Sequence, residues 1–165
     1  MTPLRHVLII AVLLGLQASL GRLISIGPFQ PNFLAIYVIY WALRRGPRDG
    51  IWIGLAVGIV QDAVTTQFLG ISPLSYVIVC FVIGKIGNYY PVSSRVTWIG
   101  WLLSGTILQN LIYFYFYASG TDLSFAKLLL NYALPATGST TVLGALWSLT
   151  PWWRPTERRG IGLME

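Results

Sequence analysis

The chain has 165 residues, of which 55% are hydrophobic and only 10% are charged. A water-soluble domain carries about 25% charged residues, because its surface has to face water. With 11 Lys and Arg and 5 Asp and Glu, the chain cannot cover a water-exposed globule of its size. The composition nearly excludes a soluble enzyme and predicts an all-α protein that spans a membrane several times.

The apolar runs, separated by turns rich in Gly, Pro and Arg, predict a bundle of six transmembrane helices. A spanning helix needs about 20 residues to cross roughly 30 Å of hydrocarbon, so six of them would occupy most of the chain. No linker between them is long enough for a second domain, which predicts a single integral membrane domain over residues 1–165. The approximate bounds of the predicted spans are 6–24, 31–45, 51–69, 73–88, 96–118 and 125–150.

The first two predicted spans leave alternatives open. A charged start and an apolar stretch also describe a secretory signal peptide, but the apolar character of the remaining chain favours a true span. The second span begins at Pro31, which the first helical turn tolerates because its N–H would be unpaired there. From Pro31 to Arg45 the helix would extend only about 22 Å. It therefore crosses a thinned region, extends upstream through Phe29, or is shielded by neighbouring helices.

Asp62 is the one ionisable residue well inside a predicted span. Counted from Ile51 it lies about 16 Å along the helix, near the middle of the bilayer. A carboxyl group at that depth costs roughly 2.5–3.5 kcal/mol, so it must face protein or water. The functional alternatives are an ion or proton site and a substrate contact. We favour interhelical hydrogen bonding by Asp62 and its neighbour Gln61, since no second acid or base in the spans completes a relay.

Small residues predict where helices approach one another closely. Gly50, Gly54 and Gly58 recur at every fourth position, which places them in one stripe on the third helix. Packing inside the bundle is favoured over a contact with a second copy or a partner protein, although the stripe would suit either. Pro135 lies inside the last span and should kink it, with nearby hydroxyl groups and neighbouring helices compensating the freed carbonyl.

The basic residues predict the orientation of the chain in the membrane. If the N-terminus is cytoplasmic, nine Lys and Arg residues fall in cytoplasmic segments, and only Arg22 and Lys127 fall in outer ones. Cytoplasmic loops carry an excess of basic residues, so both termini should be cytoplasmic. The same rule accounts for the formal net charge of +6 without a nucleic-acid partner.

The sequence offers few groups that could perform chemistry. His6 and Cys80 are the only histidine and cysteine, so a His/Cys metal site and Ser-His or Cys-His catalysis lack their components. There is no Gly-rich phosphate loop, paired-carboxylate arrangement or nucleophile elbow. We therefore expect no enzymatic activity, no cofactor and no metal ion.

Several short motifs in a fixed order carry a resemblance to a known family. A Pro31-Asn32 pair starts the short second span, and a glycine-rich third span ends in Gly58-Ile-Val-Gln-Asp62. Gly70 and the start of the fourth span follow. In this order, and with six spans in a chain of this length, the sequence resembles the bacterial MreD family of rod shape-determining membrane proteins. That family often carries an acid after the early proline, where this chain has Asn32.

The resemblance implies a fold similar to the six-helix substrate-binding components of energy-coupling-factor vitamin transporters. It implies a non-catalytic scaffold of the cell-elongation machinery in the bacterial cytoplasmic membrane, with MreC, MreB, RodA and its transpeptidase partner as partners. The rival hypothesis is a solute-binding transporter component. Its pocket would be lined by the polar outer halves of the third and sixth spans, and Ala11-Gly15-Ser19 would dock a coupling subunit.

Overall fold

The structure is a computed structural model that describes residues 9–10, 12–15, 17, 31–65, 70–90, 92–121 and 124–150. Within these ranges all regular secondary structure is helical, which confirms the predicted all-α class for this part of the chain. The helices are α2 (Phe33–Arg45), α3 (Pro47–Thr65), α4 (Ile71–Gly87), α5 (Arg95–Ser119), α6 (Phe125–Leu128), the π-helical turn η1 (Leu129–Ala133) and α7 (Leu134–Ser148).

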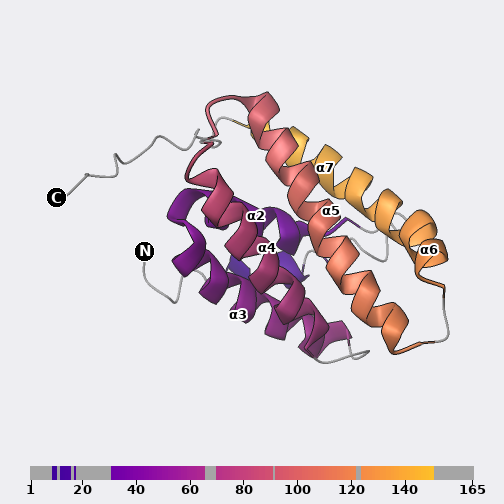
Figure 1. Cartoon of the computed structure of the whole chain (residues 1–165). Helices are drawn as coiled ribbons and strands as arrows, with labels where there is room; N and C mark the ends of the chain where they lie inside the picture. The colour runs from indigo at the N-terminus through magenta and orange to yellow at the C-terminus, as the bar shows by residue number, and fades with distance from the viewer. Residues whose placement is uncertain are drawn as a thin grey trace.

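The helices form two groups that meet along α4 and α5 (Figure 1). In the first group, α2, α3 and α4 all contact one another. In the second, α5 runs alongside α7, and the short α6 and η1 continue the line of α7 at its beginning. Helix α2 also contacts α5 and α7, so it lies between the groups.

The sequence of α2 explains where the helix begins and ends and why it is buried. Asn32 caps its beginning, where the side-chain oxygen accepts a hydrogen bond from the Ala35 N–H at 3.0 Å. Gly46 ends the helix with φ of 85°, a conformation that favours glycine. The buried residues of α2 lie on more than one face of the helix: Leu34, Ala35, Ile36, Val38, Ile39, Trp41 and Ala42. Of the three explanations for the shortness of this segment, its burial supports shielding by neighbouring helices.

Glycines on α3 allow α4 to approach very closely. A Cβ on Gly58 would collide with the Cα and N atoms of Pro73, and one on Gly54 would lie 2.9 Å from the Cys80 sulfur. A Cβ on Gly50 would lie 3.0 Å from the Cα of Ala42 on α2. The predicted stripe therefore lies against α4 along most of its length and reaches α2 at its beginning.

The second group is held by a similar close contact. A Cβ on Gly144 of α7 would collide with the Leu102 side chain of α5. The buried Trp98 indole N–H donates to the carbonyl of the same Gly144 at 3.1 Å. Close packing of the Leu102 side chain and a hydrogen bond from Trp98 thus coincide at Gly144 in the contact between α5 and α7.

Pro135 interrupts the last helical stretch in a specific way. It lies in the first turn of α7, directly after η1, where the Leu134 N–H bonds to the Leu129 carbonyl five residues back. A proline ring clashes with the carbonyl four residues before it, and the wider π turn relieves that crowding. Where the sequence predicted a kink, the structure has a π-helical turn. The Thr137 hydroxyl donates to the nearby Ala133 carbonyl at 2.7 Å.

The described helices lie at the positions of the second to sixth predicted spans. The first predicted span falls mostly on residues outside the described ranges, as do Ala11 and Ser19 of its small-residue stripe. No helix in the described part of the chain combines the length and the apolarity required to cross a membrane. Six membrane spans therefore stay a prediction.

The close contact between α3 and α4 makes a direct stability prediction. Gly58→Ala should lower the free energy of unfolding by about 1–3 kcal/mol, because the added methyl group forces the helices apart at Pro73. Gly100→Ala is the matched control, since Gly100 is also helical but a methyl group added there would meet no neighbouring atom within 4 Å. Thermal unfolding in detergent would measure both; equal stability of the two variants would contradict the close contact.

Candidate functional site

A chain of hydrogen bonds crosses the interior of the bundle and joins four helices. The Asn32 side-chain amide donates to the Tyr76 hydroxyl at 2.8 Å, and this hydroxyl donates to the Gln61 side-chain oxygen, also at 2.8 Å. The Asn32 backbone N–H donates to the Thr140 hydroxyl at 3.0 Å. The Thr140 hydroxyl donates in turn to the Ala136 carbonyl at 2.7 Å. The chain therefore links the beginning of α2 with α3, α4 and α7.

Asn32 holds the central place because it makes two of these contacts and also caps α2. Its side-chain oxygen caps α2, its side-chain amide reaches α4, and its backbone N–H reaches α7. An uncharged amide offers a donor and an acceptor on one short side chain, whereas an ionised carboxylate only accepts. An aspartate here would have to accept from the Tyr76 hydroxyl, which could then no longer donate its proton to the Gln61 oxygen.

Two hydroxyl groups of the chain are shielded from solvent, which increases their energetic importance. Tyr76 is 1% exposed and Thr140 is 1% exposed. Hydrogen bonds are electrostatically stronger in such surroundings, and an unpaired polar group there is correspondingly costly. The polar side chains of this site therefore fix which helices lie together and in which register.

Asp62 fastens the beginning of α4 to the end of α3. Its carboxylate accepts a hydrogen bond from the Gly70 N–H at 2.6 Å, and the side chain is only 5% exposed. Gly70 caps α4 with φ of 104°, and a negative charge at a helix N-terminus is favourable. Asp62 lies near the end of the described helix α3 and not near its middle. The prediction counted from Ile51, but the helix already begins at Pro47.

A second polar contact joins α5 to the last helical stretch. The Asn110 side-chain amide donates to the Thr137 hydroxyl at 2.8 Å, and it also lies 3.4 Å from the Ala133 carbonyl. Its neighbour Gln109 is 3% exposed. The Trp98 indole also donates to the Gly144 carbonyl. Hydrogen bonds therefore join α5 to the last helical stretch at two positions along its length.

The structure brings some of the predicted site residues together and separates others. Gln61 and Asp62 take part in the two hydrogen-bonded contacts just described. Pro31 is buried directly before the Asn32 cap, so it lies outside α2 and not in its first turn as predicted, because the Asn32 side chain starts the helix. Pro135 lies in another helix, at the π turn. The three glycines of α3 lie against its neighbours.

Sequence reasoning missed Tyr76 and Thr140 as partners in this site. A tyrosine inside an apolar run gives no sign of whether its hydroxyl faces another helix or the membrane interface. The capping role of Asn32 had a usable signal, because an asparagine directly before an apolar helical run is a typical helix start.

The chemistry of the site is that of binding and positioning. Asn, Gln, Thr and Tyr side chains donate and accept hydrogen bonds but do not exchange protons readily near neutral pH. Within the described ranges, no group of three or more His, Cys, Asp and Glu residues could hold a metal ion. For this part of the chain, the arrangement defines the class of an all-α bundle whose polar side chains hold its helices together.

The comparison with protein families places the chain within that class. The family model of the rod shape-determining protein MreD matches residues 3–147. The chain belongs to the MreD family, a family of proteins that determine rod shape. The resemblance inferred from the short motifs is thereby confirmed.

Two other comparisons add no relatives. No curated protein matches the chain, and no solved structure matches it. The similarity of the fold to substrate-binding transporter components therefore stays a prediction.

The Tyr76 hydroxyl can be tested by removing a single oxygen atom. Tyr76→Phe should lower the free energy of unfolding by about 1–3 kcal/mol, because the partly buried Asn32 amide loses its acceptor and the Gln61 side-chain oxygen loses its donor. Tyr115→Phe is the control, since Tyr115 is 62% exposed, and it should change stability by less than about 0.5 kcal/mol. Both values come from thermal unfolding of the purified variants in one detergent. A Tyr76→Phe protein as stable as the control would contradict the proposed importance of the chain.

Asp62 can be tested with a graded pair of substitutions. Asp62→Asn keeps an oxygen that accepts from the Gly70 N–H, so it should remain folded and largely functional. Asp62→Leu removes the acceptor and should cost about 1–3 kcal/mol. Stability in detergent and complementation of cell shape would be measured for both. Complete loss of function in both variants, with stability intact, would show that ionisation of Asp62 is required.

Proposed function

We propose that this protein is a non-catalytic membrane scaffold of the bacterial cell-elongation machinery, acting in the synthesis of the peptidoglycan wall. The observation that carries the proposal is the match to the rod shape-determining family over nearly the whole chain. The binding and positioning chemistry of the interior supports a role without catalysis.

Apolar outer faces support embedding of the bundle in the cytoplasmic membrane. On α5, Val96, Leu103, Ile107 and Leu111 are exposed at helical spacing, with Val96 80% exposed. Corresponding faces lie on α3 and α7, with the residues Trp52, Ile59, Val64, Leu134, Val142 and Leu146. Soluble monomers rarely expose apolar faces on several neighbouring helices. Lipid tails are the surroundings that such faces favour.

The modest hydropathy of individual helices is compatible with this proposal. The polar residues Gln61 and Asp62 at the end of α3 make hydrogen bonds toward α4, and they lower the mean hydropathy without facing lipid. Polar residues in membrane bundles face the interior in this way. Helix α5, with 25 residues, would extend about 37 Å, which exceeds the hydrocarbon thickness.

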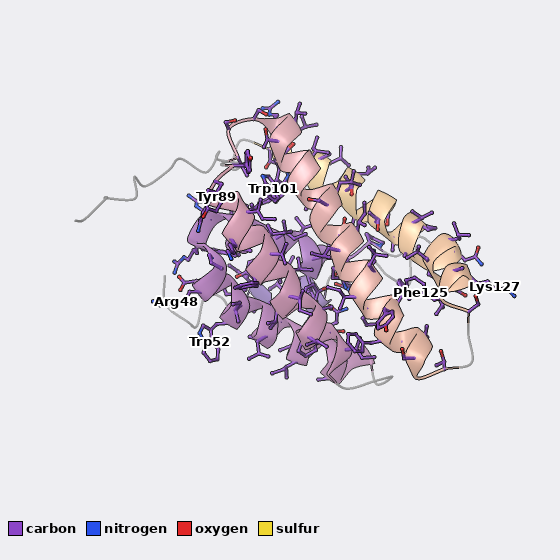
Figure 2. The ribbon with its side chains drawn as sticks, viewed as in Figure 1. Arg48, Trp52, Tyr89, Trp101, Phe125 and Lys127 are labelled. Carbon is purple, nitrogen blue, oxygen red and sulfur yellow. The ribbon has the colours of Figure 1, made fainter. Side chains whose placement is uncertain are left out.

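The distribution of charge supports the proposed cytoplasmic termini. The end of α2, the beginning of α3, the end of α4 and the beginning of α5 carry Arg44, Arg45, Arg48, Lys85 and Arg95. Lys127 lies at the opposite end of the bundle from Arg48 (Figure 2). An excess of basic residues marks the cytoplasmic side.

The partners of the scaffold would be MreC, with MreB, RodA and its transpeptidase partner in the same assembly. The small-residue contacts of α3 and α7 are occupied inside the chain, by Pro73 and Leu102 respectively. A partner helix, or a second copy in a homo-oligomer, would therefore meet the large apolar side chains on the outer faces. Contacts of this kind depend on shape and packing, which suits a scaffold.

Depletion of the protein in a rod-shaped host tests this function. We expect the cells to become round, because elongation of the wall loses its membrane scaffold. A tagged copy should restore the shape and should recover an MreC-like protein from detergent extracts, as identified by mass spectrometry. Normal shape together with a defect in vitamin uptake would contradict the scaffold and favour a transporter component.

A further inference from the structure

One end of the bundle carries a dense group of cations that the fold does not require. Arg44, Arg45 and Arg48 lie close together because Gly46 alone connects α2 to α3. The Gly46 N–H bonds back to the Ala42 carbonyl at 3.0 Å, so the chain reverses within a very short turn. All three arginine side chains are exposed.

The end of α4 adds a fourth cation to the same place. A Cβ on Gly84 would lie 2.7 Å from the Cα of Pro47, and one on Gly46 would lie 3.8 Å from the Asn88 side-chain oxygen. The α2–α3 turn is therefore packed against the last turn of α4, which carries the exposed Lys85. We name Arg44, Arg45, Arg48 and Lys85 the basic end.

Aromatic rings orient three of these four side chains. The Arg44 guanidinium donates to the Tyr40 hydroxyl and lies 5.6 Å from the centre of that ring. The Arg45 guanidinium lies 5.0 Å from the Trp41 ring. The Lys85 ammonium lies 5.8 Å from the Phe81 ring. Cation–π contacts hold the charges in place and reduce the entropy that a bound anion would otherwise cost.

The positive charge of the basic end is hardly compensated within the protein. Asp49 is the nearby acid in the described ranges, and its carboxylate lies 3.6 Å from the Arg45 guanidinium. Arg48 lies in the first turn of α3, where the helix dipole disfavours a cation. Its position therefore does not serve the stability of the helix, and its exposed charge is available to an anion outside the chain.

Exposed aromatic residues mark the depth at which this anion would be found. Trp52 is 68% exposed, Tyr89 71% and Tyr90 67%. Trp52 and Tyr89 lie at the same end of the bundle as Arg48, far from Phe125 and Lys127 (Figure 2). Amphipathic rings of this kind are enriched at the level of lipid headgroups. An anion at that level next to apolar helix faces is a phospholipid phosphate.

We propose that the basic end binds the headgroups of anionic phospholipids in the cytoplasmic leaflet. The proposal rests on the membrane embedding argued above and adds a ligand class to it. A phosphate group would accept hydrogen bonds from Arg44 and Arg48, while the acyl chains would lie along the apolar faces. Arginine suits this role because its planar donors match phosphate oxygens.

Quenching of tryptophan fluorescence by brominated lipids tests the proposal. The protein is reconstituted into vesicles that contain either brominated phosphatidylglycerol or brominated phosphatidylcholine, and the relative binding of the two lipids is measured at low salt. We expect a preference for phosphatidylglycerol. It should fall about fivefold for Arg48→Gln and further for Arg44→Gln/Arg48→Gln, since a basic residue near the surface contributes on this scale.

Lys127→Gln is the matched control, because it removes one exposed cation at the opposite end. It should leave the preference unchanged, and thermal unfolding should show that every variant is folded. Equal binding of both lipids by the wild-type protein would overturn the headgroup proposal. The proposal would also be overturned if an acidic protein were recovered only when Arg44 and Arg48 are present, and no lipid preference were found. Failure to incorporate even into phosphatidylcholine vesicles would instead contradict the membrane embedding itself.

Discussion

The rest of the bundle depends on the hydroxyl group of Tyr76, where three helices meet at one oxygen atom. It accepts from Asn32 before α2 and donates to Gln61 on α3, while its own backbone belongs to α4. Asn32 extends the contact to Thr140 on α7. A change in the register of any one of these helices would leave at least one buried polar group unpaired, and such a group is costly. The hydrogen bonds therefore select one arrangement among the many that apolar packing alone would permit.

The glycines of α3 and the hydrogen bonds of α4 depend on each other. A Cβ on Gly54 would lie 3.1 Å from the carbonyl oxygen of Tyr76 itself, so the residue that supplies the central hydroxyl also takes part in the close helix contact. In a bilayer, lipid tails are as apolar as leucine, and helices associate through packing and hydrogen bonds. Close packing and hydrogen bonding occur together here. The glycines bring the backbones of α3 and α4 close to each other, and the Tyr76 hydroxyl and the Gln61 side chain then lie within hydrogen-bonding distance.

The positions of the helices could be predicted because Gly, Pro and Arg clusters separate the apolar runs. The contacts between helices could not, because they depend on which helices become neighbours. The stripe of Gly50, Gly54 and Gly58 indicated a close approach but not that α4 would provide most of it. Asp62 was expected to meet another helix, yet its observed partner is a backbone N–H at the start of α4, which no side-chain pattern reveals. The π turn before Pro135 likewise reflects local crowding of the backbone.

The two ends of the bundle differ in chemistry, and this difference suits a protein that positions others. At one end, Asp62, Gln61 and Asn32 have their hydrogen bonds satisfied within the chain. At the other, Arg48 is exposed and lies where its own helix dipole disfavours it. The hydrogen bonds at the first end keep the helices in one arrangement, whereas the exposed cations at the other end would be available to a membrane surface. The proposed scaffold would need both properties, because partners can assemble reproducibly only on a bundle with a fixed shape and a fixed orientation in the bilayer.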